Sequence, residues 1–170
     1  MKVSPKIRTV EELAPLLADI RKAGSKIVFT NGCFDLLHAG HVRYLEAAKS
    51  AGDILVVGLN SDESVKIIKG DKRPIVKQAY RAEALAGLGC IDFVTVFNEP
   101  DPLQTIHALR PDILVKGEDW EEKEIIGADF VKKHGGSVVR IPLAPGISTS
   151  GIIQRILKCY AKVKFFGFDS

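Results

Sequence analysis

The chain has 170 residues, of which 46% are hydrophobic, and its formal net charge is +3. We expect this length to form one domain over residues 1–170, and the small net charge disfavours a general nucleic-acid binder. No apolar run reaches the about 18 to 20 residues that span a bilayer, and the N-terminus carries charges in place of a signal-peptide core. A cytoplasmic protein with no membrane or nucleic-acid partner is therefore expected.

Hydrophobic patterning predicts a leading helix, then alternating strands and helices. The leading helix covers about residues 10–23, and a C-terminal helix with an aromatic tail covers about residues 148–170. Val, Ile and Leu fill the strands without polar alternation, as in parallel strands covered on both faces. The predicted fold class is α/β, a three-layer doubly wound Rossmann-like fold with a parallel sheet of about five strands. The predicted strands are residues 26–29, 53–59, 92–97, 112–117 and 137–141.

A polar loop follows each predicted strand. Doubly wound sheets bind ligands beyond the carboxyl ends of their strands, where the winding direction reverses, so these loops form the candidate site. Neither GxxxxGKS/T nor a GxGxxG between strand and helix is present, which disfavours a P-loop NTPase and a nicotinamide-binding fold. The loops are residues 31–41, 60–73, 98–102, 117–120 and 146–150.

The first loop, Thr30–His41, reads TNGCFDLLHAGH and places two imidazoles three residues apart before a helix expected over residues 42–50. A helix start attracts anions, and each imidazole can offer an N–H to a phosphate oxygen without carrying a charge. Gly32 and Gly40 let a ligand approach the backbone closely. A lone histidine would more often cap or pack, but the HxGH pair after a strand favours a phosphate site.

This segment resembles the signature of the nucleotidyltransferase superfamily that shares the HxGH motif with class I aminoacyl-tRNA synthetases. Four segments occur in the order expected of the nucleotidyltransferase part of bacterial ADP-heptose synthases: GCFDLLHAGHVRYLEAAKSAGD, VVGLNSDESVKIIKGDKRPI, DILVKGEDW and GISTSGII. The resemblance covers about Thr9 to Leu157. It implies transfer of AMP from ATP to D-glycero-β-D-manno-heptose 1-phosphate by a stand-alone transferase whose sugar kinase lies elsewhere, with Mg²⁺ arriving with ATP.

The resemblance also implies roles within the first loop. Catalysis falls to His38 and His41, assisted by Lys69 of the second loop. Asp35 has three uses open to it: orienting an imidazole, contacting a magnesium-associated phosphate indirectly, or stabilising its own turn. Orientation is the use we favour, and Asp35 is grouped with the substrate-binding residues. Nucleotide and phosphate binding is assigned to Thr30, Asn31, Gly32, Cys33, Phe34 and Gly40.

The segment Lys69–Pro74, at the end of the second loop, places three cations around a turn, although a solvated charged loop is the plain alternative. The family has a KGDxRP segment near its active site, so we expect Lys69 and Arg73 to contact the sugar phosphate or triphosphate. Arg81 resembles a family arginine and is a candidate substrate-binding residue. Equally, it could form a surface pair with Glu83 or another carboxylate.

The later loops resemble nucleotide-binding segments. Lys116, Gly117 and Asp119 leave the fourth strand, where Asp119 can accept hydrogen bonds from a nucleobase or ribose. Trp120 could stack on a ring or cover the core. The family usually reads KGGD here, and Glu118 takes the place of the second glycine. An ISTT-like family motif grips the β and γ phosphates, which assigns phosphate binding, alongside helix capping, to Ser148, Thr149 and Ser150.

Two other functions remain open. A cytidylyltransferase acting on glycerol 3-phosphate or a related alcohol phosphate shares GxFDxxHxGH and GISTS, but such enzymes carry an arginine in RTxGISTT where Leu143 stands here, with Arg140 displaced upstream. A non-catalytic nucleotide-binding module is disfavoured because every expected site position is filled.

The cysteines and the C-terminal aromatic residues indicate the thiol state and the oligomeric state. Cys33, Cys90 and Cys159 are widely spaced and odd in number, so we expect reduced thiols, no disulfide framework and no dedicated metal site. Cys33 is expected to pack and not to act as a nucleophile. Related enzymes often dimerise, and the aromatic tail at Phe165, Phe166 and Phe168 makes a homodimer a further expectation.

Overall fold

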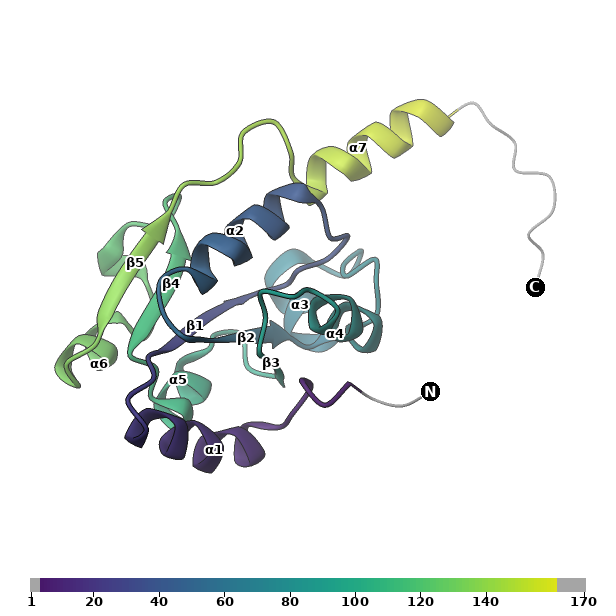
Figure 1. The fold of residues 1–170 in the computed structure, drawn as a ribbon. Coiled ribbons are helices and arrows are strands. Elements are labelled where there is room, and N and C mark those ends of the chain that lie inside the picture. Colours follow the sequence, from purple (N-terminus) through teal and green to yellow (C-terminus); the bar gives the residue numbers. More distant parts are fainter. Residues whose placement is uncertain (1–3, 162–170) are drawn as a thin grey trace.

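A computed structural model describes residues 4–161 and contains a five-stranded, fully parallel sheet (Figure 1). The order β3-β2-β1-β4-β5 places the first strand at the centre, where Phe29 lies opposite both Val56 and Leu114. This confirms the predicted doubly wound α/β class. The strands are β1 (Ile27–Gly32), β2 (Ile54–Asn60), β3 (Phe93–Phe97), β4 (Ile113–Gly117) and β5 (Ser137–Ile141).

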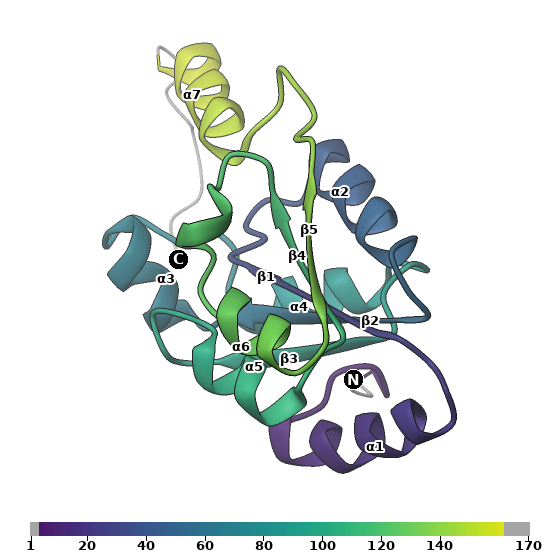
Figure 2. The same ribbon diagram turned by 90° about the vertical axis from the view of Figure 1, so that its left-hand side faces the viewer.

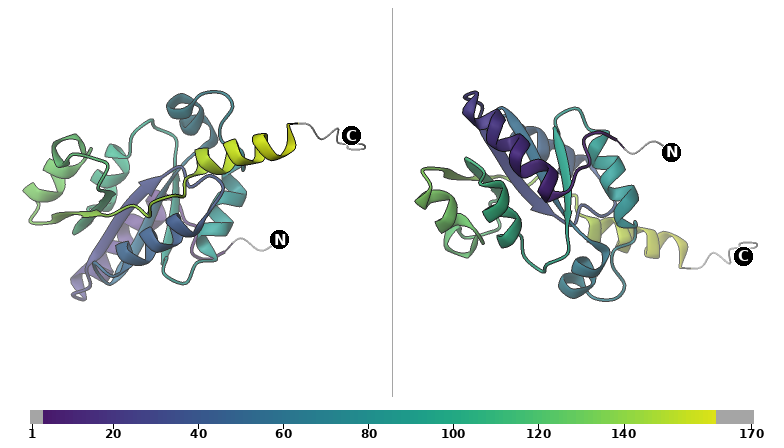
Figure 3. Two further views of the ribbon diagram at one scale, coloured as in Figure 1. Left: turned by 90° about the horizontal axis from the view of Figure 1, so that it is seen from above. Right: turned by 90° about the horizontal axis from the view of Figure 1, so that it is seen from below.

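Helices cover both faces of the sheet, which completes three layers (Figure 3). Helices α2 and α4 pack with Val28, Leu55 and Val57 on one face. On the other face, α1, α5 and α6 pack with neighbouring strand residues such as Phe29 and Val56. The helices are α1 (Val10–Lys22), α2 (Ala39–Lys49), α3 (Asp62–Lys69), α4 (Gln78–Ala86), α5 (Leu103–Leu109), α6 (Ala128–Lys133) and α7 (Thr149–Tyr160), with a short 3₁₀ helix η1 (Glu122–Glu124).

Side-chain caps determine where several helices begin. Thr9 and Glu12 form a reciprocal capping box that starts α1 as predicted. Helix α2 begins at Ala39, three residues before the predicted position, because His38 caps it. Helix α7 begins at Thr149 because the Ser148 hydroxyl accepts a hydrogen bond from the Gly151 N–H at 3.1 Å. Residues in the first turn of both helices line the same cavity.

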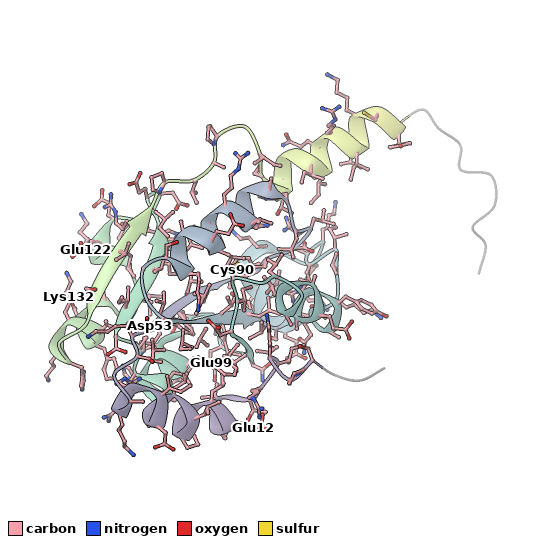
Figure 4. All side chains as sticks on the ribbon, viewed as in Figure 1. Glu12, Asp53, Cys90, Glu99, Glu122 and Lys132 are labelled. Atoms are coloured by element: carbon pink, nitrogen blue, oxygen red, sulfur yellow. The ribbon has the colours of Figure 1, made fainter. Side chains whose placement is uncertain are left out.

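The connection between β4 and β5 runs through η1 and α6. Glu122 and Lys132 point toward each other from these two elements and form an ion pair (Figure 4). The pair is exposed and contributes little, whereas Ile125, between the two elements, is buried in the core and holds this segment on the body of the domain.

Helix α7 leaves the body of the domain and projects outward (Figures 1 and 2). None of its residues is buried, and Ile156 and Leu157 are 48% and 65% exposed. The aromatic residues predicted to form the tail, Phe165, Phe166 and Phe168, lie outside the described residues. Within residues 4–161, no helix is both long and apolar enough to cross a membrane.

Candidate active site

The candidate site lies where the winding of the sheet reverses, between β1 and β4. The chain passes to one side through β2 and β3 and to the other through β5, so the loops after β1 and β4 separate at this point. A cavity of about 550 Å³ opens there. All predicted site residues line it except Thr30 and Arg81.

The two histidines stack on each other at the start of α2. Their ring centroids lie 3.9 Å apart with the planes inclined by 18°. The His38 carbonyl and its Nδ1 both accept from the His41 backbone N–H, at 2.9 and 3.4 Å. Because Nδ1 of His38 accepts, the neutral ring carries its proton on Nε2, which is then a donor. His38 therefore caps the helix and still has an N–H to offer a phosphate.

Both imidazoles are neutral at physiological pH. Burial, and to a smaller extent the neighbouring His38, lowers the pKa of His41 to about 4. Burial lowers the pKa of His38 in the same direction. His41 Nδ1 is buried and has no hydrogen-bond partner among the described residues. A buried polar atom without a partner in a cavity wall is well placed to be satisfied by a ligand.

Asp35 does not orient an imidazole, which corrects the favoured sequence interpretation. Its buried carboxylate accepts from Arg73 Nε at 2.7 Å and from the backbone N–H groups of Ile75 and Val76 at 2.8 and 2.9 Å. Burial would raise the pKa of Asp35, but these three hydrogen bonds outweigh it and lower the pKa. Asp35 is thus an anchor that ties the first loop to the segment after Lys69.

The cationic segment Lys69–Pro74 contributes two side chains to the cavity wall. Gly70 ends α3 with φ of +87°, a conformation that L side chains rarely adopt, and this turns the chain back toward Asp35. Lys69 and Arg73 both line the cavity. The Asp35 bond uses only Nε of Arg73, and within residues 4–161 the structure gives the terminal guanidinium nitrogens of Arg73 no partner. These nitrogens are available for an anionic ligand.

Arg81 lies outside the cavity. It is 1% exposed and donates to the carbonyls of Val76, Cys33 and Asn60 at 2.9, 2.6 and 2.9 Å. Its carboxylate partner is Asp62, at 2.7 Å, so Arg81 pairs with a carboxylate other than Glu83, and its guanidinium is buried where a surface pair was expected. The structure therefore places Arg81 behind the site.

Thr30 also lies behind the site. Its buried hydroxyl is 2.7 Å from the Tyr44 hydroxyl, which donates to the Val115 carbonyl at 3.3 Å. Burial raises the pKa of Tyr44 to about 12, so the phenol stays protonated. These two hydrogen bonds join β1, α2 and β4 behind the cavity.

The loop after β4 supplies a wall with a charged and an aromatic part. Lys116 Nζ lies 5.5 Å from the centroid of the Trp120 ring. Burial lowers the pKa of Lys116 to about 8, although Asp119 opposes the shift. Trp120 is 45% exposed at the cavity, so it does not cover the core. Its position allows stacking on a planar ring.

Gly117 and Glu118 stand where the family pattern has two glycines, and only the first of these positions requires a glycine. A Cβ at position 117 would lie 2.4 Å from Asp119 Oδ1 and 3.0 Å from Leu143 Cδ2, so a side chain there would displace the wall. Glu118 needs no left-handed backbone, and its N–H donates to the Ile141 carbonyl at 3.0 Å. Its exposed side chain is accommodated without distortion of the loop.

The serine turn before α7 closes the site. Ser148 caps the helix, and Thr149 Oγ1 donates to the Asp35 carbonyl at 2.8 Å. The start of α7 is thereby fixed beside the first loop, with Ser150 also lining the cavity. Capping and anion binding are compatible here, because the helix dipole and the exposed turn remain directed to the same end of α7.

Sequence reasoning missed several residues that line the cavity. Asn60 and Asp101 lie within predicted loops, so their position after strands was a usable signal. Tyr44 lies in helix α2 and not in a loop after a strand, so that signal did not point to it. The apolar wall had no such signal, because its residues come from segments far apart in the sequence. The missed lining residues are Tyr44, Asn60, Ile68, Pro100, Asp101, Pro102, Ile125, Ile126, Leu143, Ala144 and Ile147.

The cysteine of the first loop is not activated as a nucleophile. Burial raises the pKa of the Cys33 thiol, which favours the packing role over a thiolate nucleophile. Among residues 4–161, no group of three or more His, Cys, Asp or Glu side chains is arranged to hold a metal ion.

A switch-point cavity that joins two neutral imidazoles, a lysine–arginine loop and two helix N-termini defines an α/β protein that binds phosphorylated ligands. Residues 29–155 match the model of the Cytidylyltransferase-like family. The chain belongs to this family, and it is a nucleotidyltransferase.

Similar proteins agree with this assignment. Bifunctional protein HldE of Geobacter metallireducens is 50% identical over 157 residues, covering 92% of this chain and 32% of that protein. Bifunctional protein HldE of Helicobacter pylori strain G27 is 55% identical over 152 residues, covering 89% and 31%. The chain spans about a third of the length of these curated relatives. A solved lipopolysaccharide core biosynthesis protein from Thermoplasma volcanium superposes with a TM-score of 0.58 at 29% identity, covering 71% of this chain and 98% of that one.

Proposed function

We propose that the chain transfers AMP from ATP to D-glycero-β-D-manno-heptose 1-phosphate, forming ADP-heptose and pyrophosphate. Identity of about 50% to HldE proteins over nearly the whole described chain supports this substrate pair. So does the similarity to a lipopolysaccharide core biosynthesis protein. The observation that carries the proposal is the neutral His38–His41 stack, which lines one cavity with Lys69 and Arg73.

The reaction needs no strong general base. A phosphate oxygen of the sugar 1-phosphate is already an anion at neutral pH, so it attacks the α-phosphorus of ATP directly. A new oxygen–phosphorus bond forms, the bond from the α-phosphorus to the bridging oxygen breaks, and pyrophosphate leaves with that electron pair. Catalysis then depends on in-line positioning and on donors for the charge that develops on the α-phosphate oxygens.

The site residues divide between these tasks. His38 and His41 donate hydrogen bonds to the reacting phosphate, and each neutral ring keeps one N–H for this purpose. Lys69 and the terminal nitrogens of Arg73 reduce repulsion between the two anionic substrates. The Ser148–Ser150 turn and the start of α7 hold the leaving pyrophosphate. Lys116, Asp119 and Trp120 form the nucleoside end of the cavity.

Mg²⁺ is part of the proposal as a partner of ATP. The carboxylate of Asp35 is engaged with Arg73 and two backbone amides, so the ion would be held mainly by phosphate oxygens, and Asp119 is an exposed carboxylate of the cavity wall that could assist. When bound, the ion neutralises charge on the nucleotide phosphates. Chelation with EDTA should abolish turnover, and added Mg²⁺ should restore it.

Pyrophosphate release tests the proposal. ATP and CTP should each be assayed against both anomers of heptose 1-phosphate and against glycerol 3-phosphate. Release with ATP and a heptose 1-phosphate alone is expected. Release with CTP and glycerol 3-phosphate would favour the cytidylyltransferase alternative, which is disfavoured because Leu143, and no arginine, lines the cavity at the family's arginine position. Tight ATP binding with no release from any pair would favour a non-catalytic module.

A homodimer and a cytoplasmic location complete the proposal. The half-buried Ile153 and the exposed Ile156 and Leu157 share one face of the projecting α7, and an apolar stripe of this kind suits a contact between subunits. The cytoplasm is where ATP is available to such a transferase. Fractionation of cells that express the chain would test the location.

A further inference from the structure

The turn that leads to the histidines contains two bulky residues in a left-handed backbone conformation. Phe34 has φ of +43° and Leu36 has φ of +49°, and these two residues flank Asp35. Side chains of this size avoid that region, and such conformations persist where surrounding structure holds them. Only Leu37 separates this turn from His38. The direction in which His38 and His41 enter the cavity therefore depends on the turn.

Three contacts hold the turn. The Asp35 carboxylate is bound by the Arg73–Val76 segment, and its carbonyl is bound by Thr149. On the N-terminal side of Phe34, the Cys33 carbonyl accepts from Arg81 at 2.6 Å. Arg81 is the contact that reaches the turn from behind the cavity, while the other two come from segments that line it.

Arg81 is itself anchored by three further contacts. The same Nη1 that binds Cys33 also donates to the Asn60 carbonyl at the end of β2. Nε donates to the Val76 carbonyl, and Nη2 donates to Asp62. A guanidinium with fixed donors can hold such an arrangement, whereas an ammonium group cannot reproduce its geometry.

We propose that Arg81 is a positioning residue: it fixes the Cys33–Leu36 turn against the ends of β2 and the Val76 segment, and so aims His38 and His41, without touching either substrate. A direct substrate contact would require Arg81 to give up several of these bonds and leave a site that is 1% exposed. The cost of unpairing a buried guanidinium makes that unfavourable.

The substitution Arg81→Lys tests this proposal, with Arg43→Lys on the exposed side of α2 as the matched control. Turnover should fall about 10²-fold because His38 and His41 are no longer held in position, while KM for ATP and for the sugar phosphate stays near the wild-type value. The histidine resonances give a second readout. The pKa of His41, about 4 in the wild type, should rise toward the ordinary value of about 6.5 as the turn loosens.

The outcomes separate the two roles. A wild-type His41 titration together with a raised KM for the sugar phosphate would overturn the proposal in favour of direct contact, and so would unchanged kinetics. If Arg81→Lys does not fold, Asp62→Asn removes one anchor and should move the His41 titration and turnover in the same directions by a smaller amount. Wild-type behaviour of that variant would also overturn the proposal. The turnover arm rests on the proposed function, but the titration does not, so failure of one is distinguishable from failure of the other.

Discussion

The imidazoles of His38 and His41 lie face to face, 3.9 Å apart, and the backbone N–H of His41 is capped by the ring and the carbonyl of His38. Helix capping, which the structure shows, and phosphate binding, which we propose, therefore fall on one pair of residues. The first test of the site is to separate these two roles by mutation.

The capping and chemical roles of His38 should separate in two variants. Asparagine is a good N-cap, so His38→Asn should keep the stability of α2 but lose about 10²-fold in turnover. His38→Ala should lose the same turnover and, in addition, about 1 kcal/mol of unfolding free energy. Urea unfolding and pyrophosphate release measure the two effects. Equal stability of both variants would show that the cap contributes little.

Stability should decline in acid because of His41. Its pKa is about 4 when folded and about 6.5 when unfolded, so the unfolded state binds the proton first as the pH falls. The contribution of His41 is fully present above about pH 6.5 and is lost as the pH falls toward 4. Urea midpoints at pH 7, 6 and 5 should show this decline, and His41→Gln should reduce it. Asp35, whose pKa is lowered by hydrogen bonds, acts at more acidic pH than this window. If the urea midpoint of His41→Gln falls between pH 6.5 and 5 as steeply as that of the wild type, His41 is not the cause of the decline.

Asp35→Asn should destabilise the fold and loosen the cationic loop. The substitution leaves Arg73 without its charged partner and removes one of the acceptor oxygens used by Ile75 and Val76. Breaking a buried ion pair costs about 3 kcal/mol, and KM for the sugar phosphate should rise as Arg73 loses its position. Thermal unfolding and steady-state kinetics measure both. Asp71→Asn, on the exposed part of the same loop, is the control and should change neither.

Trp120 should contribute to nucleotide binding through its ring. Trp120→Ala removes a face on which a base can stack, and a loss of about 10-fold in ATP affinity is expected, whereas Trp120→Phe should keep most of it. Calorimetric titration with a non-hydrolysable ATP analogue measures the affinities. Equal affinity of the wild type and Trp120→Ala would remove Trp120 from the nucleoside end.

The apolar face of α7 should hold two subunits together. Leu157→Glu places a charge on the face shared by Ile153 and Ile156 and should convert a dimer to a monomer, as measured by light scattering over a range of concentrations. Gln154→Glu adds the same charge off that face and should leave the mass unchanged. A wild-type chain that is monomeric at all concentrations would contradict the dimer.

The sequence predicted the strands well because each is a short apolar run followed by a polar loop. It placed the helix after the first strand three residues late, because a histidine cap is not among the usual signals. The roles of Asp35 and Arg81 were beyond it for a different reason. Arg73 lies 38 residues from Asp35, and Cys33 lies 48 residues from Arg81, so no local pattern reveals either bond.

Transfer of the α-phosphate is the central claim, and ATP labelled at that phosphate tests it most directly. Incubation of the labelled nucleotide with heptose 1-phosphate should place the label in ADP-heptose, with unlabelled pyrophosphate as the second product. His41→Ala, folded as judged by circular dichroism, should reduce the labelled product about 10²-fold or more. Label that remains in ATP, or appears in ADP with no sugar nucleotide formed, would contradict the account.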